Sequence, residues 1–329
     1  MEFRTKIAPV PAPFSLSHAD RLLVMGSCFS ETMGQRLRES GFRIVQNPFG
    51  VVYNPASIAQ ALRRLMQEEP FQATDLVALD GLYHSFHHHG SFSNSNPKEA
   101  LNHMNAAYWQ AVDALKESTH LILTLGTSWV YSLNESGQVV ANCHKFPAGQ
   151  FNRHRLSITD IVDDYSSLFD RLLEMNSRLR IVLTVSPIRH QKDGFHANSL
   201  SKSILLLATD RLAERYSNVY YYPSYELMMD DLRDYRFYAD DMLHPSALAS
   251  SYIWDHFSET YFSKQTKEIA KQVQQVRKAM EHRPFHPDES AYRRFAQKNL
   301  AAIEGLILSE PALDLKEEKA FFERIIRGR

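Results

Sequence analysis

This chain has little cysteine, no excess of charge of one sign and no long apolar run. Only Cys28 and Cys143 occur among 329 residues, too few for a disulfide framework. Lys and Arg number 37 against 38 Asp and Glu, a balance that indicates neither nucleic acid nor an anionic membrane as a partner. We find no run of about 18 apolar residues and no signal-peptide core. We therefore expect a cytoplasmic protein with two free thiols.

The residues that are present predict an α/β domain followed by a helical extension. Strands expected at 22–25, 42–45, 120–125, 181–185 and 219–221 alternate with helices at 31–40, 55–68, 97–117, 157–177, 197–215 and 247–262. Such alternation favours a parallel sheet covered by helices over residues 1–262, with an insertion at about 70–97. Amphipathic helices at 264–282, 288–308 and 314–327 form an extension over 263–329. A tail of this kind either covers one face of the domain or mediates self-association into a homo-oligomer.

A nucleophile candidate lies near the N-terminus. Leu22 to Met25 predict a buried strand and Gly26 ends it, which leaves Ser27 and Cys28 on the turn before a helix. Unpaired N–H groups at a helix start attract anions, and the helix dipole lowers the pKa of a thiol placed there. Cys28 is the preferred nucleophile and Ser27 its rival. The alternative for Cys28 is a small buried apolar side chain.

Three predicted strands end in glycine or serine, and a late loop adds a carboxylate and an imidazole. The strand ends are Gly26, Gly126 and Ser186. Because parallel strands end at one edge of a sheet, we expect these residues to line one crevice. Asp241 and His244, spaced D-x-x-H, would complete a set of nucleophile, base and orienting acid. They could instead form a surface loop and a cap for the helix after Pro245.

Other histidines and the second cysteine offer weaker candidates. His190 follows a strand end, so it is expected at the crevice or behind its lining. The adjacent pair Cys143 and His144 suggests pocket lining or structure, with His144 the one expected to touch substrate. The cluster His84 to His89 raises the alternative of a metal-dependent hydrolase. Since no carboxylate or cysteine lies at metal-ligand spacing beside it, we expect no metal.

Matched in order, several segments resemble a known family. The stretch Gly26-Ser27-Cys28-Phe29-Ser30 is similar to the signature of the GSCFA family, a branch of the SGNH (GDSL-type) hydrolase superfamily. Further segments that resemble blocks of the family are 47–50 (NPFG), 125–131 (LGTSWVY), 142–145 (NCHK), 186–190 (SPIRH) and 241–245 (DMLHP). The resemblance covers about residues 20–262.

The resemblance implies a flavodoxin-like three-layer sandwich that catalyses acyl transfer without a cofactor. Where the superfamily has Gly-Asp-Ser, this chain has Gly26-Ser27-Cys28; where it has Gly-x-Asn-Asp, the chain has Gly126-Thr127-Ser128-Trp129. The implied catalytic residues are Cys28, His244 and Asp241; oxyanion support would come from Ser27, Gly50, Gly126 and Ser128, and pocket lining from Asn47, His144 and His190.

The function expected on these grounds is that of an esterase, acyl hydrolase or acyltransferase acting on an ester or thioester. The substrate would be a small acylated compound, for example one linked to carbohydrate. A second interpretation is a catalytically degenerate protein that binds an acylated or glycan ligand, since both the serine and the asparagine of the superfamily are replaced.

Overall fold

A five-stranded sheet forms the centre of the fold. The computed structural model describes residues 4–281 and 289–327. The strands are β1 (Arg21–Gly26), β2 (Arg43–Gln46), β5 (His120–Leu125), β9 (Arg180–Val185) and β10 (Val219–Tyr222), in the order β10-β9-β5-β1-β2. The pairs β1–β5, β5–β9 and β9–β10 are parallel, which confirms the predicted parallel sheet.

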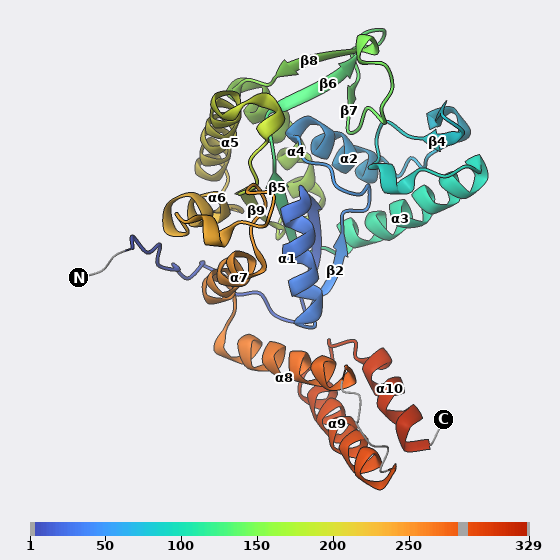
Figure 1. The fold of residues 1–329 in the computed structure, drawn as a ribbon, viewed down its shortest axis with the longest axis vertical. Coiled ribbons are helices and arrows are strands. Elements are labelled where there is room, and N and C mark those ends of the chain that lie inside the picture. The colour runs from blue at the N-terminus through green and yellow to red at the C-terminus, as the bar shows by residue number, and fades with distance from the viewer. Residues whose placement is uncertain (1–3, 282–288, 328–329) are drawn as a thin grey trace. The chain divides into compact units, whose positions relative to one another are not determined.

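Helices cover the sheet, as the α/β alternation predicts (Figure 1). They are α1 (Cys28–Glu39), α2 (Pro55–Gln67), α3 (Pro97–Glu117), α4 (Ile158–Met175), α5 (Phe195–Arg215), the short α6 (Ser224–Glu226) and α7 (Ala247–Tyr261). Helix α2 starts where the Asn54 side chain accepts the N–H of Ser57 and Pro55 occupies the first turn. Apolar faces of α2, α4 and α5 pack with β1, β5 and β9 into one core. This arrangement is that of a three-layer sandwich.

Helix α1 begins at Cys28, three residues before the predicted start at residue 31. Ser27 explains the difference, because its Oγ accepts the N–H of Phe29 at 3.3 Å and its carbonyl accepts the N–H of Ser30 at 2.8 Å. A serine in this position caps a helix. Cys28 is therefore the first helical residue, directly on the turn.

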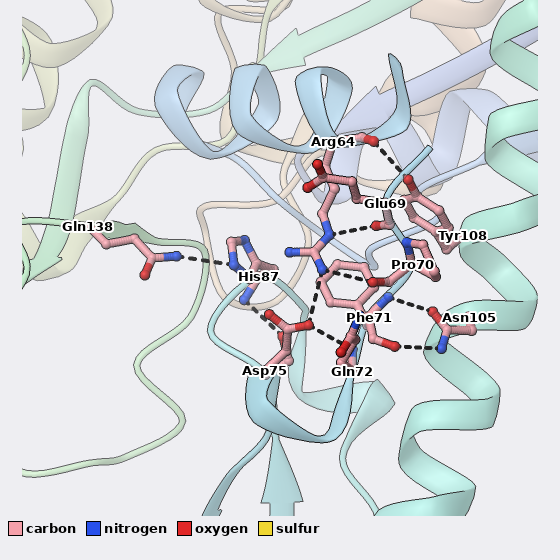
Figure 2. Close-up of polar contacts among 11 residues, drawn as sticks. Arg64, Glu69, Pro70, Phe71, Gln72, Asp75, His87, Asn105, Tyr108 and Gln138 are labelled. Carbon is pink, nitrogen blue, oxygen red and sulfur yellow. Dashed lines mark hydrogen bonds and ion pairs between the residues drawn. The ribbon is translucent and has the colours of Figure 1, made fainter. Parts of the chain in front are cut away.

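The insertion at about 70–97 contains a small hairpin of β3 (Val77–Leu79) and β4 (Leu82–His84). Figure 2 shows how it is anchored to the helices beside it. Arg64 of α2 forms an ion pair with Asp75 at 3.0 Å and lies 3.8 Å from the ring centre of Phe71. Asn105 of α3 accepts the N–H of Phe71 and donates to its carbonyl. These contacts fix the insertion against α2 and α3.

A second, antiparallel sheet contains β6 (Trp129–Leu133), β7 (Val139–Val140) and β8 (Phe151–Arg155) in the order β7-β6-β8. Strands β6 and β7 pair as an antiparallel hairpin. The sequence does not predict strand β8, because FNRHR lacks an apolar alternation. In the structure four of its five residues are exposed. Backbone pairing with β6 therefore decides its conformation.

The chain divides into two compact units, one of residues 1–8, 22–34 and 45–253 and the other of 9–21, 35–44 and 254–329. Within the second lie α8 (Lys264–Met280), α9 (Glu289–Ser309) and α10 (Lys316–Arg327), close to the expected bounds. This unit also holds earlier segments, since Thr266 donates to the Leu16 carbonyl and Gln274 to Ser40. The expected helix start at 288 lies outside the described residues. No helix in the described ranges is long and apolar enough to cross a bilayer.

Candidate active site

The carboxyl ends of β1, β5 and β9 lie level with one another. Gly26 pairs with Thr124, and Thr124 pairs with Thr184. The strand order also reverses between β1 and β5, and ligands of open parallel sheets bind at such a point. A Cβ on Gly126 would lie 3.5 Å from the Cβ of Ser27. The edge therefore brings the turn of Cys28 to the end of β5.

The turn at Gly26 has almost no conformational freedom. Gly26 has a φ of 144°, and a Cβ there would lie 2.3 Å from the Thr124 carbonyl oxygen. Asn47 accepts the Gly26 N–H at 3.0 Å and the Ser30 hydroxyl at 3.1 Å through Oδ1. Asn47, predicted to line the substrate pocket, thus holds the turn in place. Its Nδ2 is buried without a hydrogen-bond partner among the described residues.

Cys28 is a free, exposed thiol at this turn. Partial loss of water around the sulfur has the largest effect on its pKa and raises it. The negative charge of Glu31 raises the pKa further, whereas the backbone N–H of Cys28 lowers it. The expectation of a lowered pKa is therefore wrong, because the helix start is outweighed by these two effects. A thiol of this kind needs a base to take its proton.

Asp241 and His244 form a preorganised pair on the loop before α7. Asp241 Oδ2 lies 2.5 Å from His244 Nδ1, and Oδ1 accepts the N–H groups of Leu243 and His244, each at 2.9 Å. These N–H groups, together with the imidazole, lower the pKa of Asp241 to about 2. The carboxylate therefore stays charged and fixes the proton on Nδ1, which leaves Nε2 to act as an acceptor.

His190 connects this loop to the end of β5. Burial, and next the charge of Lys202, lower the pKa of His190 to about 4, while a contact with the Gly126 backbone and the charge of His244 also act on it. Its ring lies 5.9 Å from that of Tyr53. His190 is thus a neutral imidazole near the end of β5.

Most of the predicted oxyanion donors are engaged within the protein. The N–H of Gly50 donates to the Asn47 carbonyl at 2.7 Å, and that of Gly126 to the Tyr53 carbonyl at 2.7 Å. Ser128 is fully buried, and both its N–H and its hydroxyl donate to Ser201 Oγ. The N–H of Cys28, at the first position of α1, has no intrahelical partner to donate to. Of these backbone N–H groups it is the one best placed to receive an oxyanion.

Three polar residues of α5, which sequence reasoning missed, hold the strand ends together. Lys202 is fully buried and donates to the carbonyls of Gly126 at 2.6 Å and Ser186 at 2.7 Å. Burial lowers the pKa of Lys202 to about 7. Asn198 accepts the His190 N–H at 2.9 Å, and Ser201 binds Ser128 as described above. The sequence did contain a signal for these three residues. Their helical spacing places them on the same buried face of α5 as Leu205 and Leu212.

The histidine cluster is engaged in packing and hydrogen bonds. His84 stacks on His144 at 4.6 Å, and His144 Nε2 lies 2.8 Å from the Ser85 carbonyl oxygen. His144, expected to touch substrate, is itself buried. His88 is buried, and burial lowers its pKa well below the ordinary value. Within residues 4–281 and 289–327 no group of three or more His, Cys, Asp or Glu could hold a metal ion, so the metal interpretation gains no support.

Comparison with known families agrees with this arrangement of motifs. The model of the GSCFA family matches residues 21–257, which include the Cys28 turn, the three strand ends and the Asp241–His244 loop. A second model, of the GSCFA domain protein C-terminal domain, matches residues 273–328. No curated protein matches the chain. Since the first match covers well over half of the sequence, the chain belongs to the GSCFA family.

Proposed function

We propose that this protein is an SGNH-like hydrolase or acyltransferase that acts on an ester or thioester through Cys28, His244 and Asp241. The observation that carries the proposal is the Asp241–His244 pair at 2.5 Å, in a chain whose exposed thiol lies on the turn after β1. An ionised carboxylate that holds the Nδ1 side of an imidazole is the arrangement of a general base with its orienting acid. The link to the SGNH superfamily rests on the order of the motifs.

The proposed reaction proceeds through an acyl-cysteine. Cys28 Sγ attacks the carbonyl carbon and its proton passes to His244 Nε2, while Asp241 stabilises the resulting imidazolium. The tetrahedral intermediate collapses, the bond to the leaving group breaks, and His244 returns the proton to the departing alkoxide or thiolate. Water, or an acceptor alcohol, then attacks the thioester, loses its proton to His244, and releases the acyl group. His244 finally returns this proton to the Cys28 sulfur.

The raised pKa of Cys28 fits this order of events. A neutral thiol is deprotonated as it attacks, so the imidazole acts as a general base rather than as one half of a resting ion pair. The oxyanion would be received by the N–H of Cys28, since the N–H groups of Gly50 and Gly126 are engaged.

Those engaged donors favour a second candidate function. A site with few free donors stabilises a tetrahedral oxyanion poorly, which suits a protein that binds an acylated or glycan ligand without turnover. For either function we propose a small acylated substrate or ligand, for example one linked to carbohydrate. Two free thiols also suit the cytoplasm, the compartment we propose.

Intact-mass spectrometry after exposure to p-nitrophenyl acetate tests the proposal. We expect one acetyl adduct on the wild type, its loss in Cys28→Ala together with loss of nitrophenol release, and its retention in Ser27→Ala. Cys143→Ala is the matched control, because it removes the other thiol. An adduct that persists in Cys28→Ala with equal turnover would overturn the cysteine mechanism, and absence of both adduct and turnover in the wild type would support the binding function.

A further inference from the structure

A cavity of about 360 Å³ lies where β6, β7 and β8 meet the segment after Gly50. Five aromatic side chains line it: Tyr53, Trp129, Tyr131, Phe146 and Phe151. Cys143, Lys145 and Lys192 also line it. A small, largely apolar cavity with a few polar groups has the character of a ligand site. The acyl-transfer proposal uses none of these side chains.

The wall that carries Cys143 is an unfavourable turn that is held in place. His144 and Lys145 have φ values of 47° and 64°, and the N–H of Phe146 donates to the Cys143 carbonyl at 2.9 Å. Two left-handed residues in the middle of a turn normally call for Asn or Gly. Here the Asn142 side chain accepts the N–H of His144 at 2.8 Å, and the ring of His144 lies 2.8 Å from the Ser85 carbonyl oxygen. The turn places Cys143, Lys145 and Phe146 on the cavity wall.

The charge at this cavity is positive. Arg153 is paired with Asp193 and lies 4.3 Å from the ring centre of Trp129. Lys145 and Lys192 are exposed, and neither has an acidic partner in the described part of the chain. Lys192 lies close enough to Cys143 to act on its pKa in the lowering direction. In addition, the indole N–H of Trp129 is buried without an acceptor among the described residues, which native proteins rarely leave so.

We propose that this cavity binds a small anionic aromatic compound. The flat ring would pack among Tyr53, Trp129 and Phe146, and the anionic group would face Lys145 and Lys192. Aromatic walls favour a flat ring through stacking, and two unpaired ammonium groups favour a negative charge. The proposal does not depend on turnover at Cys28, so binding alone tests it.

Isothermal titration of the full-length protein with benzoate is the direct test. Benzyl alcohol serves as the neutral probe and acetate as the probe without a ring. We expect binding of benzoate at least about fivefold tighter than that of either control, because each lacks one of the two recognised features. Comparable affinity for all three probes, or no heat with benzoate, would overturn the proposal.

Lysine variants locate the site. Lys145→Ala combined with Lys192→Ala should weaken benzoate binding about three- to tenfold, the effect expected for two exposed charge contacts. Lys98→Ala removes an exposed lysine of α3 and should leave the affinity unchanged. Cys143→Phe should block the cavity and abolish binding. Unchanged affinity in the double lysine variant would mean that benzoate binds another surface, and it would overturn the proposal for this cavity.

Discussion

The two cysteines of the chain occupy opposite electrostatic settings. Cys28 is exposed on a capped turn beside Glu31, whereas Cys143 is half-buried on a strained turn near Lys192. Burial raises the pKa of both thiols, but the neighbouring charge raises it further at Cys28 and lowers it at Cys143. The candidate nucleophile is thus the thiol whose neighbouring charge disfavours the thiolate. In the proposed mechanism a base supplies the reactivity of Cys28. The comparison can be tested by removing that base, the buried lysine at the strand ends or the charge of Glu31.

Removal of the base should have the largest effect. We expect His244→Ala to lower kcat/KM for p-nitrophenyl acetate by about 10²–10⁴-fold, the usual contribution of a positioned general base. His196→Ala, which removes an exposed histidine of α5, is the control and should retain full activity. Equal activity of the two variants in steady-state assays would show that Cys28 does not rely on His244.

Lys202 donates to the carbonyls of Gly126 and Ser186 behind the strand ends, and its removal should change how stability depends on pH. In the unfolded chain this amine keeps its proton up to about pH 10, whereas in the folded protein its pKa falls to about 7. The unfolded state binds more protons between these values, so the free energy of unfolding rises with pH by up to about 1.4 kcal/mol per unit there. Lys202→Met should lose this rise.

Urea denaturation at pH 7 and pH 9 measures the difference. Lys98→Met, at an exposed position of α3, should keep the dependence of the wild type. An identical rise in Lys202→Met would mean that the buried amine is not what links stability to pH. Lys202→Met also leaves the buried carbonyls of Gly126 and Ser186 without their donor, which should lower the free energy of unfolding by about 1–3 kcal/mol for each carbonyl.

Neutralising the acid beside Cys28 should have the smallest effect. Glu31→Gln removes the charge that raises the pKa of the Cys28 thiol, so alkylation by iodoacetamide at pH 8 should become about two- to fivefold faster. Cys143, in the same molecule, should react at an unchanged rate, which peptide mass spectrometry can follow. A rate increase at both thiols would point to a change of the fold rather than of local charge.

The parallel sheet and the contact between Asp241 and His244 could be predicted because they depend on local pattern. Continuous apolar runs at β1, β5 and β9 identify buried strands, and parallel strands end at one edge. The D-x-x-H spacing lets a single loop join Asp241 to His244, and the structure has this contact at 2.5 Å. Such features need no knowledge of distant partners.

The features that could not be predicted depend on partners far away in the sequence. Strand β8 forms because it pairs with β6, although its own side chains are polar. The engagement of Ser128 by Ser201 and of the Gly126 carbonyl by Lys202 joins residues more than 70 positions apart. The pKa of Cys28 likewise depends on how much water reaches it. The spacing of residue types along the chain does not reveal such contacts or such a pKa.

The strand order β10-β9-β5-β1-β2 has a consequence for the timing of synthesis. Cys28 leaves the ribosome early, whereas His244 follows only after the strands that complete the sheet. Contacts between such distant segments form late in folding. A nascent or truncated chain would therefore carry the thiol without its proposed base, and the proposed reaction could begin only once synthesis had passed residue 244. The order of these segments would thus delay the proposed activity until the domain is whole.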